Sequence, residues 1–263
     1  MTFHLAACAE MLYLELPFVE RVKLIHEMGF QVEIWDWTSK DLIELESTGA
    51  VFSSMTGYVS GDLLTRNGIA ALLESASRSI EAAKKLGCAR LNLHGTGLGA
   101  NGTALIQRTE VTPGEWQTAV DTLKRIAALG EQHEQVFVLE NLNTLVDHPG
   151  TPFAKARETI QLVTSVNNPY LKLNLDLYHA QIGEGNLISL IRDSYDYLGE
   201  IQVADVPGRF QPGTGEINYS RIGRELYELG FEGVVALEGW ASGGSEAALQ
   251  DFRRIMLADL PTG

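Results

Sequence analysis

Short apolar runs alternate with longer amphipathic segments along the whole chain. The clearest amphipathic segment is 67–86, where apolar residues recur at steps of three or four positions: Ile69, Leu72, Leu73, Ala76, Ile80 and Ala83. This period predicts a helix with one buried face, and Gly87 is a typical residue to end it. Further helices are predicted over 17–28, 41–47, from 112 onward, and over 154–166, 186–197, 219–229 and 245–258.

Eight short apolar runs lie between these helices and are the predicted strands. They cover 3–10, 31–37, 50–57, 89–95, 135–141, 170–176, 200–205 and 233–239. Their content of Val, Ile and Leu is typical of parallel strands that are buried on both faces. Eight strand–helix units in 263 residues predict the α/β class and a single (β/α)8 TIM barrel, a fold that usually takes about 250 residues.

A doubly wound open sheet is the alternative fold for such a pattern. That fold usually carries a Gly-rich phosphate-binding loop after its first strand, whereas the first predicted strand here runs into the sequence AEMLYLELP. No linker, low-complexity tract or shift of composition divides the chain. We therefore expect one TIM-barrel domain over residues 1–263.

The formal charge of −14 limits the expected partners. Nucleic-acid binding depends on clustered Lys and Arg, so we expect no nucleic-acid partner, while acidic groups at one end of a barrel suit a cation. No apolar run approaches the roughly 20 residues of a membrane span, and the N-terminus lacks a leader pattern. We expect a cytoplasmic protein in which Cys8 and Cys88 are buried free thiols rather than a disulfide.

Polar side chains mark the ends of four of the predicted strands. Glu140 ends VFVLE, Asp176 ends LKLNLD, Gln202 lies inside EIQVAD and Glu238 ends VVALE. They are separated by 36, 26 and 36 residues, close to the about 31 residues of one barrel unit. Because the carboxyl ends of the strands form the active site in TIM barrels, we expect these four side chains at similar height on consecutive strands.

This set of side chains predicts a site for one divalent metal ion. Three carboxylates and an amide oxygen are hard donors, which suit Mg²⁺, Mn²⁺ or Co²⁺ better than structural zinc. Without a cation, three carboxylates at one apolar barrel mouth repel each other and are costly to remove from water. The alternative is that each acid caps a helix or lies on the surface just past its strand.

Four further residues are candidates for substrate binding. His179 follows Asp176 by three positions, at the start of the loop expected there, and His94 ends the fourth predicted strand. Arg209 lies in a Gly/Pro-rich loop after the seventh strand, and Arg66 lies in the loop after the third. Because the barrel mouth is anionic, a sugar-acid substrate needs a positively charged side chain there, and Arg209 and Arg66 are the candidates. The structural alternative for each is a solvated loop residue.

Three longer motifs carry a resemblance to a known family. They are LENLN at 139–143, the run DLYHAQIGEGNL from Asp176 onward, and IQVADVPGRFQPGTGEINY at 201–219. On these motifs nearly the whole chain resembles the hydroxypyruvate isomerase family of the xylose isomerase-like barrels, which also include ketose 3-epimerases, inosose-processing enzymes and endonuclease IV. Two loops depart from the pattern: IWDWTSKD stands where a LFPY-like stretch is usual, and GDLLTRNG follows a GD…RG pattern only loosely.

The resemblance implies roles for individual residues. The four strand-end residues would bind the metal, and Glu140 and Glu238 would also transfer protons. His179 and Arg209 would hold substrate oxygens. Glu33 matches an acidic position on the second strand, where it is either structural or lines the site. Both divergent loops line the substrate end of the pocket. The resemblance is therefore a better guide to the metal chemistry than to the identity of the substrate.

The implied reaction is proton transfer between adjacent carbons of a small α-hydroxy carbonyl compound, through a cis-enediolate that the metal stabilises. One glutamate removes the proton and the other returns it from the opposite face. The expected substrate is a small sugar or sugar acid. The first candidate substrates are hydroxypyruvate, which would give 2-hydroxy-3-oxopropanoate (tartronate semialdehyde), or a related four-carbon oxo acid.

Other outcomes stay open at this point. A ketose 3-epimerase and an inosose-type dehydratase use the same kind of metal site. A phosphodiesterase-type endonuclease ranks last, because it needs a zinc cluster and a basic surface, and the chain has six His and a charge of −14. A non-catalytic sugar-binding barrel gives no reason for two metal-bound glutamates.

Two further expectations concern the tryptophans and the assembly. Each of Trp35, Trp37 and Trp240 is expected either to form an apolar wall around a short carbon chain or to lie in the core. The chain is expected to form a homodimer or a homotetramer.

Overall fold

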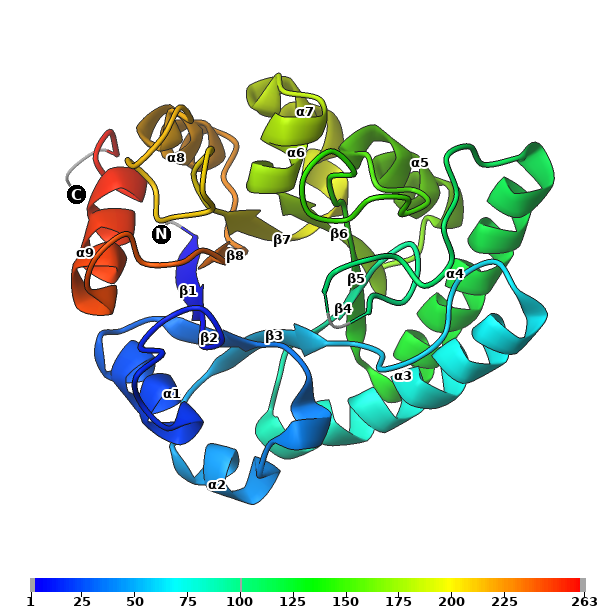
Figure 1. The fold of residues 1–263 in the computed structure, drawn as a ribbon, viewed down its shortest axis with the longest axis horizontal. Coiled ribbons are helices and arrows are strands. Elements are labelled where there is room, and N and C mark those ends of the chain that lie inside the picture. The colour runs from blue at the N-terminus through cyan, green and yellow to red at the C-terminus, as the bar shows by residue number, and fades with distance from the viewer. Residues whose placement is uncertain (1–2, 100, 261–263) are drawn as a thin grey trace.

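The computed structural model of the chain describes residues 3–99 and 101–260. It is a closed barrel of eight parallel strands in chain order, with the helices outside it (Figure 1). The strands are β1 (His4–Cys8), β2 (Gln31–Ile34), β3 (Phe52–Thr56), β4 (Arg90–Leu93), β5 (Val136–Glu140), β6 (Leu171–Asp176), β7 (Leu198–Val203) and β8 (Val234–Leu237). This architecture confirms the predicted (β/α)8 TIM barrel, because a doubly wound sheet is open.

The helices follow the strands around the barrel. They are α1 (Phe18–Glu27), α2 (Leu42–Ser47), α3 (Arg66–Leu86), α4 (Pro113–His133), α5 (Ala156–Val166), α6 (Leu177–Gly183), α7 (Leu187–Ser194), α8 (Tyr219–Glu228) and α9 (Ser245–Met256), with short 3₁₀ helices η1 (Trp37–Ser39) and η2 (Tyr195–Tyr197). All predicted helices are present, with ends that differ by a few residues.

Helix α6 corrects the sequence-based expectation of a loop after the sixth strand. Asp176 ends β6 and also caps α6, because its Oδ1 accepts a hydrogen bond from the backbone N–H of His179 at 2.9 Å. A carboxylate in this position satisfies a free N–H of the first turn and so starts a helix. His179 therefore lies in the first turn of a helix rather than in a loop, and it is fully buried.

Local sequence signals explain where the two longest helices begin and end. The Thr112 hydroxyl accepts a hydrogen bond from the Glu115 N–H at 3.2 Å, and the Glu115 carboxylate accepts one from the Thr112 N–H at 3.0 Å. This reciprocal pair is a capping box at the start of α4. Helix α3 ends at Gly87, whose φ of 63° is the left-handed conformation that suits glycine.

Strand register places the four strand-end residues at similar height, as predicted. Glu140 pairs with Asn174, which lies two residues before Asp176, and Asp176 pairs directly with Gln202. Glu238 lies two residues beyond the β8 partner of Gln202. Neighbouring strands of a TIM barrel are staggered by about one residue each. The offsets therefore bring all four residues to one end of the barrel.

The hydrophobic core and the two cysteines agree with the sequence-based expectations. Buried apolar side chains such as Phe137, Leu173 and Ile126 pack between the barrel and the helices. Cys8 and Cys88 are both buried and free, as predicted. Among the described residues, no helix combines the length and the apolar character that crossing a bilayer requires.

Candidate active site

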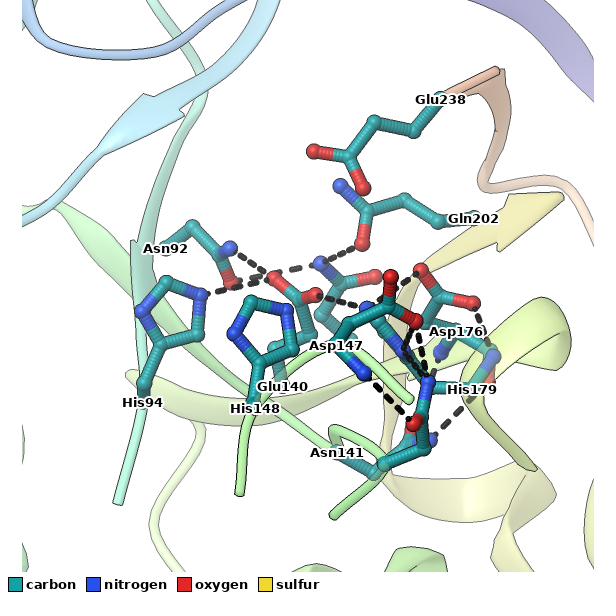
Figure 2. Close-up of polar contacts among 12 residues, drawn as sticks. Asn92, His94, Glu140, Asn141, Asp147, His148, Asp176, His179, Gln202 and Glu238 are labelled. Atoms are coloured by element: carbon teal, nitrogen blue, oxygen red, sulfur yellow. Dashed lines mark hydrogen bonds and ion pairs between the residues drawn. The ribbon is translucent and has the colours of Figure 1, made fainter. Parts of the chain in front are cut away.

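Buried carboxylates and a histidine converge at the carboxyl ends of β5 and β6. One potential ligand atom from each of Glu140, Asp176 and His179 lies within 4.8 Å of the others. His179 Nε2 is 3.9 Å from Glu140 Oε1 and 3.7 Å from Asp176 Oδ2. Figure 2 shows these side chains pointing toward one another, with Gln202 and Glu238 beside them. The fold thus brings two of the predicted metal ligands and one predicted substrate residue into one cluster.

Arg209 joins Glu238 to this cluster. Its Nη2 forms an ion pair with Glu238 Oε2 and lies 3.9 Å from Asp176 Oδ2. The other oxygen of Glu238, Oε1, accepts a hydrogen bond from the indole N–H of Trp35 at 2.7 Å. Both carboxylate oxygens of Glu238 are therefore held by side chains that come from other barrel loops.

Gln202 belongs to a hydrogen-bonded layer inside the barrel. Its amide oxygen accepts a hydrogen bond from Asn174 Nδ2 at 2.7 Å, and its Nε2 donates to Glu33 Oε1 at 3.0 Å. The Asn174 Nδ2 also lies 3.3 Å from Asn92 Oδ1, and Asn92 donates to Glu140 Oε2. The layer links the buried Glu33 to Glu140 and leaves the Gln202 oxygen one lone pair for another partner. The ligand role of Gln202 stays a prediction.

The site has more carboxylates than positively charged side chains. Burial, together with the charge of Glu238, raises the pKa of Glu140 to about 8. Burial also raises the pKa of Asp176 and of Glu33 well above their usual values, although Arg209 opposes the shift at Asp176. Arg209 is the only guanidinium or ammonium group that forms an ion pair with Glu140, Asp176 or Glu238 in the described chain. Hard oxygen donors with uncompensated charge fit a divalent cation.

These shifts predict how the stability of the metal-free protein depends on pH. Glu140 binds its proton up to about pH 8 when folded but only up to about 4.5 when unfolded. The folded state holds the extra proton between these values, so stability falls as pH rises from about 4.5 to about 8. Urea unfolding of chelator-treated protein across this range should record the decline, and Glu140→Gln should flatten part of it. If the stability of Glu140→Gln depends on pH in the same way as that of the unmodified protein, Glu140 is not the group responsible.

Two more histidines lie at the same end of the barrel. His94 Nε2 is 3.2 Å from Glu140 Oε2, and its Nδ1 is 2.9 Å from the Tyr58 hydroxyl. The hydroxyl itself donates to the Thr96 carbonyl at 2.8 Å. The His148 ring lies edge-on to the His179 ring, with centroids 5.1 Å apart. His94 is thus brought to the cluster as expected, and His148 joins it without any sequence signal.

Arg66 and Trp37 lie apart from the cluster. Arg66 is the first residue of α3, where it is exposed, and within the described chain it forms no ion pair with the cluster. The indole N–H of Trp37 donates to Ser79 on α3 at 3.1 Å, so this ring packs against a helix outside the barrel. The structure gives Arg66 no contact that supports a role in substrate binding, and that role stays a prediction.

Asp205 organises the loop that carries Arg209. Its Oδ1 accepts hydrogen bonds from the N–H groups of Val206 and Ile217, both at 3.0 Å, and its Oδ2 accepts one from Gly213 N–H at 2.9 Å. The loop is also joined to the segment after β8, because Trp240 N–H donates to the Arg209 carbonyl at 2.8 Å. Arg209 is thereby held on a rigid support.

Replacing Asp205 should therefore loosen this support. Asp205→Ala leaves backbone N–H groups without acceptors, each at a cost of about 1–3 kcal/mol when buried, and we expect the free energy of unfolding to fall by about 3 kcal/mol. Urea unfolding measures this loss. Asp205→Asn, which keeps one acceptor oxygen, should lose less. Equal stability of Asp205→Ala and the unmodified protein contradicts the role.

Three asparagines and Trp35 hold other residues of the site in ways that the sequence did not predict. Asn92, Asn143 and Asn174 hold other site residues by hydrogen bonds, and Trp35 binds Glu238. Asn143 lies inside the LENLN motif, and Trp35 was expected as an apolar wall or a core residue rather than as a hydrogen-bond donor. Asn92 and Asn174 lie in strands, where an asparagine is equally compatible with a purely structural role.

A parallel eight-stranded barrel with buried acids at the carboxyl ends of its strands defines a TIM-barrel enzyme. The family model of the xylose isomerase-like TIM barrel matches residues 22–258, and the chain belongs to this family. The chain is 30% identical to the 2-oxo-tetronate isomerase of Pectobacterium atrosepticum, over 93% of this chain and 94% of the relative. It is 26% identical to the hydroxypyruvate isomerase of Escherichia coli, over 93% of this chain and 96% of that one.

A solved structure agrees with this assignment. The structure titled AP endonuclease, family 2, from Brucella melitensis superposes with a TM-score of 0.82 at 26% identity, over 96% of this chain and 98% of that chain. The resemblance to the hydroxypyruvate isomerase family is thus confirmed, and the chain is an enzyme of the isomerase class.

Proposed function

We propose that the enzyme is a metal-dependent isomerase of a small α-hydroxy carbonyl acid, with hydroxypyruvate or a four-carbon 2-oxo acid as its substrate. The observation that carries the proposal is the placement of two carboxylates. Glu140 ends β5 and Glu238 follows β8, and Asp176 and Arg209 connect them at the mouth of the barrel. The names of the Pectobacterium and Escherichia relatives support this class of substrate.

The residues that would hold the divalent ion, Mg²⁺ or Mn²⁺ first, are the four predicted strand-end residues Glu140, Asp176, Gln202 and Glu238. When bound, the ion supplies charge stabilisation for the anion that forms when a carbon next to a carbonyl loses its proton. The buried and uncompensated carboxylates of the site support this assignment.

Two glutamates are suited to move the proton. In the reaction of hydroxypyruvate, one of Glu140 and Glu238 takes a proton from C3 and the other returns a proton at C2. The hydroxyl proton on O3 passes to O2 at the stage of the cis-enediolate, so that the product is 2-hydroxy-3-oxopropanoate. Since the two side chains come from strands on different sides of the mouth, they can reach different faces of a planar intermediate.

Arg209 is suited to fix the substrate. Its guanidinium donates several N–H groups in one plane and so matches a carboxylate or two neighbouring oxygens of a sugar acid. Burial alone lowers the pKa of Arg209, but Glu238, Asp176 and Glu140 outweigh that effect and raise it. The guanidinium therefore stays charged throughout the working pH range and can bind an anionic substrate next to the acids.

Incubation of the metal-loaded enzyme with candidate substrates in D₂O tests the proposal. The panel contains hydroxypyruvate, 2-oxo-tetronates, ketopentoses and inososes, and NMR follows both isomer formation and deuterium at the carbon next to the carbonyl. We expect isomerisation and exchange with one of the oxo acids. Turnover of ketopentoses alone identifies an epimerase, and an enone absorbance from an inosose identifies a dehydratase; either outcome contradicts the proposal.

A further inference from the structure

Asn143 makes hydrogen bonds through every polar position of its side chain. Its Oδ1 accepts from the backbone N–H groups of Val146 and Asp147, at 2.9 and 3.1 Å. Its Nδ2 lies 2.6 Å from Asp147 Oδ2 and 2.7 Å from His179 Nδ1. Because a backbone N–H can only donate, Oδ1 must be the atom that faces Val146 and Asp147. The orientation of the amide is therefore fixed, and Nδ2 is the atom that faces His179.

This orientation determines which nitrogen of His179 carries the proton. An amide NH₂ group can only donate, so His179 Nδ1 must accept and cannot carry a hydrogen. The ring is neutral and its proton is on Nε2. Asn143 and His179 are both buried, with 1% and 0% of their surfaces exposed, so water does not replace this hydrogen bond. The local structure thus selects one tautomer.

The other side of the ring faces the active site. His179 Nε2 is buried and has no hydrogen-bond partner among the described residues. The nearest carboxylate oxygens, Asp176 Oδ2 and Glu140 Oε1, are 3.7 and 3.9 Å away, which is too far for a hydrogen bond. An unused buried donor is costly unless a ligand fills its place.

We propose that Asn143 is a positioning residue that locks His179 as an Nε2–H donor, which holds an oxygen atom of the substrate and does not coordinate the metal. Metal coordination needs a lone pair on Nε2, and the hydrogen bond from Asn143 leaves a proton there instead. His179 is therefore excluded from the ligand set even though it lies with Glu140 and Asp176. The partner is a carbonyl, hydroxyl or carboxylate oxygen. The assignment of this oxygen atom to the substrate of an isomerase rests on the proposed function.

The experiment reads the tautomer directly. Protein labelled with ¹⁵N in histidine and loaded with diamagnetic Mg²⁺ gives long-range ¹H–¹⁵N correlations that separate protonated from unprotonated ring nitrogens, and His179→Gln assigns the signals. We expect His179 to be protonated on Nε2 and unprotonated on Nδ1. Protonation on Nδ1 in the unmodified protein overturns the proposal.

The double substitution Asn143→Asp with Asp147→Asn exchanges donor and acceptor between the two positions. It keeps the hydrogen bond between residues 143 and 147, so it protects the fold, but it turns a carboxylate oxygen toward His179 Nδ1. We expect the proton to appear on Nδ1, and kcat/KM to fall about 10- to 100-fold with the metal content unchanged, as when a supporting hydrogen bond is lost. Continued protonation on Nε2 alone contradicts the role of Asn143.

Asp147→Asn alone is the matched control. It leaves the Asn143 amide facing His179, so the tautomer should not change. A change of tautomer in this control assigns the effect to Asp147 and overturns the proposal. The two proposals fail separately: if no oxo acid is turned over but the NMR results hold, the proposed function is wrong and the role of Asn143 stands.

Discussion

Glu238→Gln should abolish isomerisation and the exchange of substrate hydrogen with D₂O, with a loss of about 100- to 10,000-fold in kcat. An amide cannot take a proton from carbon, yet it has nearly the same size as the carboxylate. The neutral side chain can still accept a hydrogen bond from the Trp35 indole, which lies 2.7 Å from Glu238 Oε1. NMR in D₂O measures the exchange, and the far-UV spectrum and thermal unfolding report whether the barrel is intact.

Glu200→Gln is the matched control for this experiment. Glu200 is another fully buried glutamate of the barrel, on β7, and its Oε1 accepts a hydrogen bond from Ser54 at 3.1 Å. It has no hydrogen bond or ion pair with Glu238 or Arg209 among the described residues. This variant should keep its exchange activity. If Glu238→Gln still exchanges hydrogen at the normal rate, Glu238 is not the proton-transfer group.

Asp176→Asn should lower the affinity for Mn²⁺ by at least about 100-fold, more than the loss of a residue that only supports a ligand. The asparagine still caps α6, because Asn and Asp are similar at this position, so the substitution removes the charge and spares the helix. Calorimetric titration with Mn²⁺ and metal analysis after dialysis measure the effect. Activity should disappear with a chelator and return with Mn²⁺ in the unmodified enzyme.

The control for this prediction is Asp62→Asn. Asp62 is a buried aspartate whose Oδ1 accepts hydrogen bonds from Leu64 N–H and Thr65 N–H, both at 2.7 Å, just before α3. It is outside the carboxylate cluster, so its substitution should leave metal affinity unchanged. Full metal occupancy in Asp176→Asn would falsify the ligand role of Asp176.

The site was predictable to different degrees for different residues. Glu140, Asp176 and Glu238 each follow a short apolar run, and a residue at the end of a buried parallel strand must lie at the mouth of the barrel. Helix α6 was not predicted, because one residue, Asp176, both ends a strand and caps the helix. The alternative interpretation of Asp176 as a helix cap is thus correct for its Oδ1, while Oδ2 faces the site.

The sequence by itself determined the barrel and the height of the strand-end acids. Both depend on local signals: the spacing of apolar residues, helix caps and the position of an acid in its own strand. Only the tertiary structure decided which side chains touch. Trp35 holds Glu238 across 203 residues, and Asn143 selects the tautomer of His179 across 36. Such contacts depend on the register and closure of the whole barrel, and these cannot be predicted from a short stretch of sequence.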